Sequence, residues 1–259
     1  MNIDIHNHTK LCNHAEGEIE DFVIKAISEK IDIFGFSDHA PMNFDQKYRM
    51  SFNQMKEYEN SILHAKEKYI KDIEILLGYE VDFLENLVDE RVINANVDFL
   101  IGSVHFLKKW GFDNPEFIGE YKNKDIDTIW EEYFEAIRQM AKSGLFDIVG
   151  HIDLIKVFKY LPKKDIRIIA KDSIKAIKKA DMVVEINSAG LRKPVKEIYP
   201  GNEIMELVSE YDISVTFSSD AHRVEEINYK KDEAVALAKK FGYTKCAIFR
   251  EREKIMVNF

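Results

Sequence analysis

The chain has 259 residues, of which 46% are hydrophobic and 32% are charged, a composition typical of a globular protein that buries a full core. Its 46 acidic residues outnumber its 37 basic ones, and the formal net charge of −9 argues against non-specific binding to nucleic acid or to an anionic membrane. Two widely separated cysteines, no basic and apolar leader, and no apolar run near the ~18 residues that span a bilayer predict a soluble cytoplasmic protein.

Along the chain, short apolar runs alternate with segments of helical hydrophobic spacing. Strands are predicted at residues 3–5, 33–36, 73–81, 97–104, 146–149, 182–186 and 213–217. Helices are predicted at residues 19–31, 51–71, 125–142, 165–180, 202–210 and 230–241. Residues 110–121 are predicted to form a loop because they contain Gly111, Pro115 and Gly119, and the run 246–250 closes the chain.

Strands and helices alternate about seven times, and no low-complexity linker interrupts them. Repeated units of this kind predict an α/β protein with a parallel sheet, and seven units favour a TIM-like barrel formed by one domain, residues 1–259. A doubly wound open sheet is the alternative, but no Gly-x-Gly-x-x-Gly follows any predicted strand.

Seven of the eight histidines lie at the C-terminal end of a predicted strand or in the loop after it: His6, His8, His14, His39, His105, His151 and His222. His6 and His8, two residues apart on one strand, present their imidazoles to the same side. The C-terminal strand ends of a barrel meet at one mouth, so these side chains would gather in one small volume. Metal ions are the simplest reason to gather them, because imidazoles repel one another when charged. His64 lies within a helix and is interpreted as an ordinary side chain.

Glu80 and Asp220 also follow strands and would supply anionic ligands. A carboxylate can bridge two cations, whereas a neutral imidazole cannot readily do so. Histidine and carboxylate ligands without cysteine suit zinc, iron(II) or manganese. Cys12 lies near these residues in the sequence, but we interpret it as a small packed thiol.

Eight motifs in chain order cover most of the sequence: Asp4-Ile5-His6-Asn7-His8-Thr9, Cys12-x-His14-Ala15-x-Gly17, Gly35-x-Ser37-Asp38-His39-Ala40-Pro41, Gly78-x-Glu80-Val81-Asp82, Gly102-Ser103-x-His105, Gly150-His151-x-Asp153, Glu185-Ile186-Asn187-Ser188-Ala189-Gly190-Leu191-Arg192-Lys193-Pro194 and Ser219-Asp220-Ala221-His222. Together they resemble the polymerase-and-histidinol-phosphatase (PHP) superfamily and, within it, the PHP-type histidinol phosphatases. The resemblance implies a distorted seven-stranded β/α barrel, in agreement with the strand count.

The resemblance also implies a cluster of three divalent transition metals, which would be zinc, iron or manganese. The implied ligand sets are His6, His8, Glu80 and Asp220 for the first metal, Glu80, His105 and His151 for the second, and His14, His39 and His222 for the third. Asp220 and His222 are expected to act in catalysis as well. A cluster of this kind suits hydrolysis of phosphate esters, and we expect in-line attack by a metal-activated hydroxide without a phospho-enzyme intermediate.

Basic side chains near these motifs are candidates for binding the substrate phosphate, because a guanidinium matches phosphate oxygens in geometry. Arg192 is the first candidate, since the resemblance includes its loop. The others are Arg49, Arg223 and Lys156. For Asp82 and Asp153, a hydrogen bond to a ligating histidine and a contact to substrate are both compatible with the sequence.

The leading functional interpretation is a histidinol-phosphate phosphatase of histidine biosynthesis that acts on a small phosphate monoester. Alternatives are a PHP phosphoesterase for another monoester or a nucleotide, and a degenerate metal-binding barrel without activity. An amidohydrolase barrel also begins with His-x-His, but it would leave His14 and His39 unexplained. A nuclease is disfavoured because the acidic chain has no basic stripe. No nucleic-acid or membrane partner is expected, and the sequence leaves the oligomeric state open.

Overall fold

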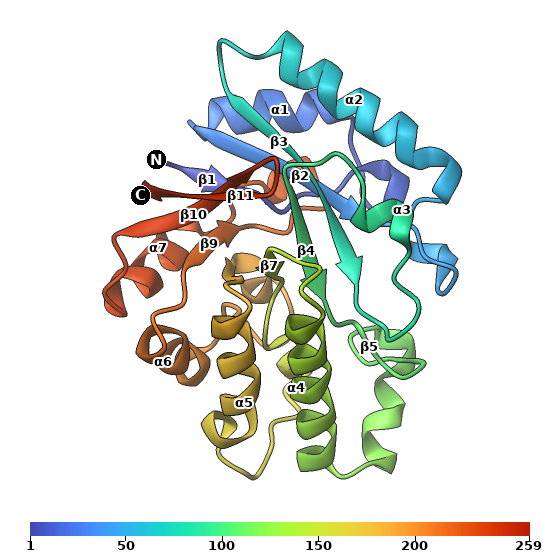
Figure 1. Cartoon of the computed structure of the whole chain (residues 1–259), viewed down its shortest axis with the longest axis vertical. Coiled ribbons are helices and arrows are strands. Elements are labelled where there is room, and N and C mark those ends of the chain that lie inside the picture. Colours follow the sequence, from blue (N-terminus) through green and yellow to red (C-terminus); the bar gives the residue numbers. More distant parts are fainter.

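Seven parallel strands form the central sheet of the computed structural model, which describes residues 1–259. In pairing order they are β1 (Ile3–Asp4), β2 (Ile33–His39), β3 (Glu74–Asp82), β4 (Phe99–Ser103), β7 (Ile148–Val149), β8 (Val183–Asn187) and β9 (Val215–Ser218) (Figure 1). The pairing order follows the chain, as expected when a helix returns the chain from each strand to the start of the next. The strand predicted at 146–149 is only two residues long in the sheet.

The sheet curls until β9 meets β1, and a few backbone hydrogen bonds close this seam. The Ile5 N–H donates to the Phe217 carbonyl at 3.2 Å, and the His8 N–H donates to the Ala221 carbonyl at 2.9 Å. On the other side of β1, Gly35 is required because a Cβ there would lie 2.8 Å from the Ile5 backbone. The result is a nearly closed seven-stranded barrel, so the predicted fold class is confirmed.

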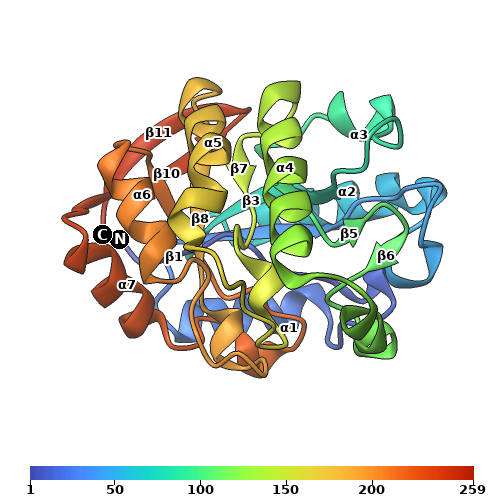
Figure 2. The same ribbon diagram turned by 90° about the horizontal axis from the view of Figure 1, so that it is seen from below.

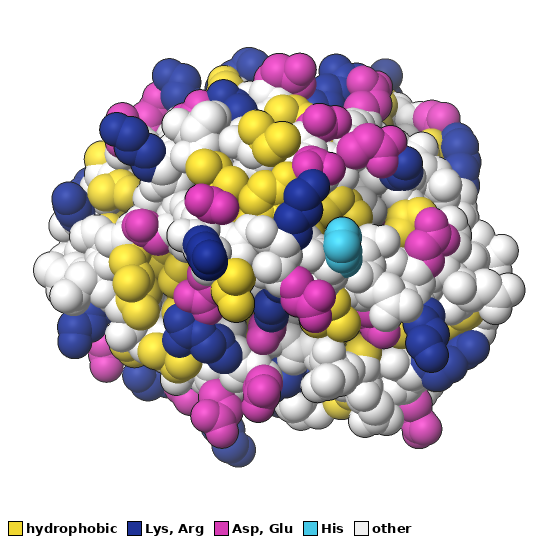
Figure 3. All heavy atoms as spheres, turned by 90° about the horizontal axis from the view of Figure 1, so that it is seen from above, with side chains coloured by type: hydrophobic (Ala, Val, Ile, Leu, Met, Phe, Trp, Pro, Cys, Tyr) yellow, Lys and Arg dark blue, Asp and Glu magenta, His cyan; other side chains and the backbone are white.

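Seven α-helices surround the barrel (Figures 1 and 2). They are α1 (Ile19–Ser28), α2 (Met55–Lys68), α3 (Glu90–Ile93), α4 (Ile126–Ser143), α5 (Ile166–Lys179), α6 (Asn202–Glu210) and α7 (Lys231–Lys240). In α4, Asp125 caps the Thr128 N–H at 3.0 Å, and Gly144 ends the helix in the left-handed conformation. Only α3 was not predicted. Figure 3 views the face formed by α1 and α2, where acidic and basic side chains are interspersed.

Residues 110–121 are more ordered than the predicted loop. Trp110–Gly111 forms β6, which pairs with β5 (Phe106–Leu107), and a 3-10 helix spans Pro115–Asn123. Asn114 caps this helix at Glu116 N–H, and Pro115 stands at its first turn. Local capping, which hydrophobic periodicity does not register, therefore orders this segment.

Aspartates lie at the N-terminal end of the barrel, immediately before strands. In three of them the carboxylate accepts a hydrogen bond from a backbone N–H of the neighbouring strand or the residue before it: Asp32 from Asn2 (2.7 Å), Asp98 from Leu77 (2.8 Å) and Asp147 from Leu100 (2.8 Å). We call these three residues the aspartate pins. They tie β2 to β1, β4 to β3, and β7 to β4.

A C-terminal hairpin covers the same end of the barrel. Its strands are β10 (Lys245–Arg250), predicted as the closing run, and β11 (Glu253–Asn258), and they lie beside β9 and β1 (Figure 1). Three basic side chains of the hairpin form ion pairs with acids near the starts of strands. Arg250 pairs with Glu74 (2.6 Å), Arg252 with Asp147, and Lys254 with Asp181. The acids of this end therefore find their counter-charges within the chain.

Candidate metal centre

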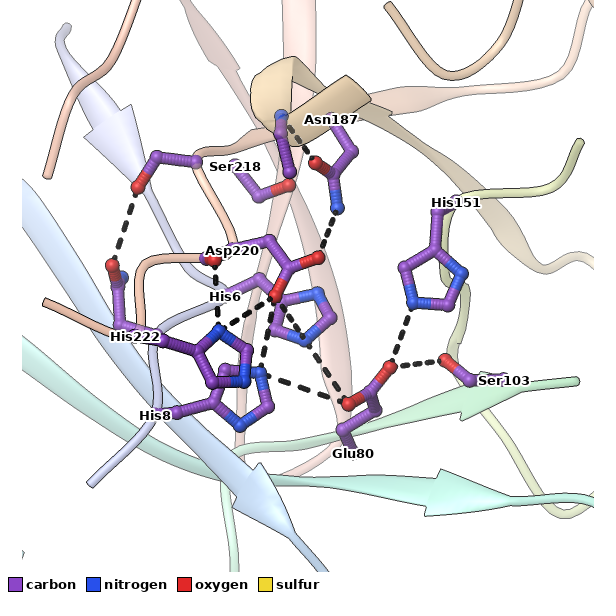
Figure 4. Close-up of polar contacts among 12 residues, drawn as sticks. His6, His8, Glu80, Ser103, His151, Asn187, Ser218, Asp220 and His222 are labelled. Atoms are coloured by element: carbon purple, nitrogen blue, oxygen red, sulfur yellow. Dashed lines mark hydrogen bonds and ion pairs between the residues drawn. The ribbon is translucent and has the colours of Figure 1, made fainter. Parts of the chain in front are cut away.

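The C-terminal ends of six barrel strands, together with the segments that follow them, bring all nine predicted ligand residues together at the C-terminal mouth (part of the site is drawn in Figure 4). Three sets have potential ligand atoms that all lie within 4.8 Å of one another: His6–His8–Glu80, Glu80–His105–His151 and His14–His39–His222. These sets coincide with the three ligand groups implied by the sequence resemblance, with Asp220 beside the first. A fourth set joins Cys12 to His8 and His222.

Glu80, near the end of β3 and only 1% exposed, stands between two of these sets. Its Oε1 lies 2.9 Å from His151 Nε2 and 3.6 Å from His105 Nε2. Its Oε2 faces three other imidazole nitrogens: His6 Nε2 (3.4 Å), His8 Nε2 (3.7 Å) and His39 Nδ1 (2.9 Å). One carboxylate thus presents an oxygen to each side, which is the geometry that a bridging ligand needs (Figure 4).

Asp220 reaches the first set from the opposite side of the seam. Its Oδ1 lies 3.2 Å from His8 Nε2 and 3.9 Å from His6 Nε2, while its Oδ2 accepts a hydrogen bond from Asn187 Nδ2 at 3.3 Å. Its φ of 51° is left-handed, a conformation that aspartate tolerates better than most residues. His6 and His8 on one segment and Asp220 on another therefore converge on one point (Figure 4).

Three buried carboxylates hold the other ring nitrogen of the histidines. Nδ1 of His6 lies 2.6 Å from Glu185, Nδ1 of His8 lies 3.4 Å from Asp38, and Nδ1 of His105 lies 2.7 Å from Asp82. A carboxylate only accepts, so Nδ1 carries the proton and Nε2 is free to bind a metal. Sequence reasoning named Asp82 but assigned no role to Asp38 or Glu185; ionisable residues within apolar strands were the available signal.

Several ring nitrogens make no hydrogen bond within the chain, although carboxylate oxygens lie close to some of them. His6 Nε2, His8 Nε2, His39 Nδ1 and His151 Nδ1 are buried without a hydrogen bond. His14 Nε2 and His222 Nε2 lie 3.0 Å apart, although His14 Nδ1 is already 2.8 Å from the Cys12 carbonyl. Buried polar atoms are rarely left unpaired, and two facing imidazole nitrogens need a proton or a metal between them. The donor set therefore fits transition metals of the zinc type.

The electrostatics of the site also point to cations. Burial alone would raise the pKa of Glu80 and of Asp220, but the surrounding histidines hold both well below their ordinary values. Burial lowers the pKa of His39 to about 4. His105 shows the opposite: burial would lower its pKa, but Asp82 and Glu80 raise it to about 10. Ionised carboxylates are the groups that stabilise charged imidazoles here. Bound divalent cations would supply this positive charge in place of the imidazole protons.

A cleft of about 460 Å³ opens above these sets. Three of the four predicted phosphate-binding residues line it, namely Arg49, Arg192 and Arg223, whereas Lys156 does not. Lys193 and Tyr48 also line the cleft, as do three acids, Asp45, Asp113 and Glu226. None of these five was predicted as a substrate contact.

The two inner arginines are engaged with the site itself. Arg192 donates to the carbonyls of Ser219 (3.0 Å) and Asp220 (2.9 Å), and thereby holds the loop that carries Asp220. Arg49 is 3% exposed and donates to Asp82 at 2.9 Å, which in turn contacts His105. Both guanidinium groups are therefore fixed beside the ligand sets.

The side chains of the other two phosphate-binding candidates, Arg223 and Lys156, form no hydrogen bond or ion pair with the ligand residues. The Arg223 side chain is 59% exposed and pairs with Glu16 at 3.1 Å. Lys156 is buried and lies 2.9 Å from Asp153, which also accepts a hydrogen bond from Gly201 N–H. Of the two aspartates with open roles, only Asp82 thus contacts a candidate ligand. The Cys12 thiol is buried, which raises its pKa and fits the predicted packed role, while its place in the fourth set leaves ligation geometrically possible.

A barrel that gathers seven imidazoles and two carboxylates at its C-terminal mouth has the architecture of a metal-dependent hydrolase. The family model for the PHP domain matches residues 4–189, and the chain belongs to the PHP domain family. The match ends before Asp220 and His222, which the fold brings to the same mouth. No helix of the chain is long and apolar enough to cross a membrane.

Named relatives cover nearly the whole chain. A probable histidinol-phosphatase from Deinococcus radiodurans is 33% identical over 96% of this chain and 97% of its own. A histidinol-phosphatase from Bacillus subtilis is 26% identical over 87% of this chain and 95% of its own. The crystal structure of histidinol phosphate phosphatase from Lactococcus lactis, complexed with zinc, L-histidinol and phosphate, has a TM-score of 0.82 at 21% identity and covers 98% of both chains.

Proposed function

We propose that the protein is a histidinol-phosphatase, a metal-dependent phosphomonoesterase that converts L-histidinol phosphate to L-histidinol and phosphate in histidine biosynthesis. The observation that carries the proposal is the placement of three ligand sets around Glu80, below a cleft that three arginines line. The relatives that match nearly the whole chain bear the same name.

The metals are proposed to number three. His6, His8, Glu80 and Asp220 would hold one, His105, His151 and Glu80 the second, and His14, His39 and His222 the third. Zinc is the first candidate, because the Lactococcus lactis enzyme was crystallised with zinc, and iron and manganese accept similar donors. Bound there, the metals would lower the pKa of a water molecule and neutralise charge on the phosphoryl oxygens. Asp220 and His222 both line the cleft and are the proposed catalytic pair.

The chain's own residues would orient the substrate. Arg192 and Arg49 face the cleft with fixed guanidinium groups and could donate to phosphate oxygens. Arg223 at the rim would attract the phosphate rather than fix it. Lys156 would act only through Asp153, its partner at 2.9 Å. The acids Asp45, Asp113 and Glu226 on the same cleft suit the ammonium and imidazole groups of histidinol, which carry or accept positive charge.

We treat residues 1–259 as one catalytic domain, because strands from the first and last thirds of the chain close one barrel and supply one site. We also propose that the enzyme works in the cytoplasm. Both cysteines are free and buried, as expected in a reducing compartment.

A substrate panel tests the proposal. Purified enzyme loaded with zinc is assayed for phosphate release from histidinol phosphate, nucleoside monophosphates and sugar phosphates. We expect kcat/KM for histidinol phosphate to exceed the others by at least about a hundredfold, because the acidic part of the cleft would contact only that substrate. Equal rates across the panel would reassign the enzyme to another monoester, and no release from any member would contradict phosphatase activity.

Hydrolysis in oxygen-18 water tests direct attack by water. Phosphate that carries one labelled oxygen after a single turnover is expected. Unlabelled phosphate would contradict attack of water on phosphorus. A single label does not by itself exclude a phospho-enzyme, because water that hydrolyses such an intermediate at phosphorus also labels the phosphate once.

A further inference from the structure

The seam between β9 and β1 divides the first ligand set. His6 and His8 lie on the β1 side, whereas Asp220 lies on the β9 side, as does His222 of the third set (Figure 4). β1 is only two residues long, and few main-chain hydrogen bonds cross the seam: Ile5 N–H to the Phe217 carbonyl, His8 N–H to the Ala221 carbonyl and, beyond the ligands, Glu16 N–H to the His222 carbonyl. Side-chain contacts across the seam therefore matter for fixing the two sides relative to each other.

The carboxylate of Asp4 crosses this seam. Its Oδ1 accepts the Ser219 N–H at 2.9 Å, and its Oδ2 accepts the Ser219 hydroxyl at 2.5 Å and the Asn228 N–H at 3.0 Å. Asn7 Nδ2 donates to Oδ1 from the β1 side at 3.3 Å. Asp4 and Ser219 are each 1% exposed, and Ser219 directly precedes Asp220.

Four donors converge on this one side chain, and only a group that accepts at both oxygens satisfies them all. No basic side chain lies within ion-pair distance of Asp4, and these hydrogen bonds satisfy its buried carboxylate oxygens. Asp4 belongs to none of the potential ligand sets. Its contacts are the segment that carries His6 and His8 and the segment that carries Asp220.

We propose that Asp4 is a positioning residue of the metal centre: its carboxylate clasps the two segments at the barrel seam and thereby sets the distance between His6, His8 and Asp220. This inference rests on the proposed function, because it concerns the same site. Asparagine at position 4 would direct an N–H₂ group at hydrogen-bond donors, so the clasp would open even though the side chain keeps its size.

The test measures zinc binding rather than turnover alone. Chelator-stripped wild-type, Asp4→Asn, Ser219→Ala and Asp98→Asn proteins are titrated with zinc by calorimetry, after circular dichroism has established that each is folded. Asp4→Asn is expected to weaken zinc binding by about 10–100-fold, the range for residues that orient metal ligands. Its kcat should recover in excess zinc. Asp98→Asn removes another buried carboxylate, 9% exposed, at the other end of the barrel and should change zinc affinity by no more than about twofold.

Unchanged zinc affinity in folded Asp4→Asn, or equal losses in Asp4→Asn and Asp98→Asn, overturns the positioning role. If Asp4→Asn does not fold, Ser219→Ala decides: it removes the hydroxyl donor and leaves the N–H donors, so a smaller loss of zinc affinity is expected, and no loss overturns the inference. Wild-type protein that binds no zinc would overturn the proposed function itself. Zinc binding by wild type together with unchanged variants would overturn only the role of Asp4.

Discussion

At the N-terminal end of the barrel, Asp98 and Asp147 each accept a neighbouring backbone N–H and also face a cation of the same chain, Lys66 or Arg252. At the C-terminal mouth, Glu80 and Asp220 face imidazoles and no lysine or arginine side chain within ion-pair distance. The first end satisfies its charges internally. The second leaves ring nitrogens without partners and reaches balance only with added cations, so one end serves stability and the other serves chemistry.

The largest expected effect follows from neutralising the Glu80 carboxylate at the mouth. Glu80→Gln keeps the shape of the side chain but removes the charge that faces two ligand sets. We expect kcat to fall by at least about a thousandfold, since metal-based charge stabilisation contributes several kcal/mol. Steady-state assays with saturating zinc would measure it. A loss of less than tenfold would contradict the bridging role.

Metal removal should affect stability as well as activity, because the mouth of the barrel lacks internal counter-charges. Stripping zinc with a chelator should lower Tm by roughly 10 °C relative to protein with zinc at a thousandfold excess over Kd. Differential scanning calorimetry with and without zinc measures this. Equal Tm values would show that the mouth is balanced without metal. The Asp98→Asn variant should show the same zinc-dependent shift.

Asp98→Asn, at the N-terminal end of the barrel, should lower stability but leave kcat nearly unchanged. Loss of the acceptor for Leu77 N–H and of the pair with Lys66 should cost about 1–3 kcal/mol of unfolding free energy, measured by urea denaturation. We expect kcat per folded molecule to stay within about twofold of wild type, because Asp98 touches no ligand. A hundredfold loss of kcat would break the division between the two ends.

The smallest effect concerns Lys231, whose Nζ donates to the Ile3 carbonyl and lies 3.9 Å from the centre of the Phe217 ring. Burial lowers its pKa from 10.5 to about 8, although Asp4 opposes this. Between these pH values the unfolded chain binds more protons than the folded one, so stability should rise with pH from about 8 to 10.5. In Lys231→Met, urea denaturation across this range should show a flatter profile than in wild type. Identical profiles would contradict the assignment.

Much of the fold could be predicted because hydrophobic periodicity and strand order carry it. The seven predicted strands and six predicted helices are all found in the structure, and the histidines at or after strand ends are found at one mouth. The short pair β5 and β6 and the 3-10 helix at Pro115–Asn123 were missed, since capping and turn geometry order them and hydrophobic spacing does not.

The support around the site was less predictable. Asp38 and Glu185 orient His8 and His6, but each does so across a long separation in sequence that only the closed barrel brings together. Arg49 and Arg192 were chosen for phosphate, yet in the structure both also hold elements of the site, Asp82 and the Asp220 loop. Tertiary packing decides which acid pairs with which base. Local sequence patterns do not show this pairing.

The aspartate pins bear on strand register, which determines whether ligand residues on neighbouring strands lie side by side. In the pairing of β2 with β3, His39 lies opposite Glu80, so the strands must align to the residue for these ligands to meet. Sliding a strand by one position would turn each of its side chains to the opposite face. Asp98 and Asp147 join β4 to β3 and β7 to β4 far from the mouth, where no metal is needed. We therefore expect them to favour this register during folding. Once β3, β4 and β7 have paired, the strand ladders themselves keep His105 and His151 at the level of Glu80, so a folded Asp98→Asn variant retains the site.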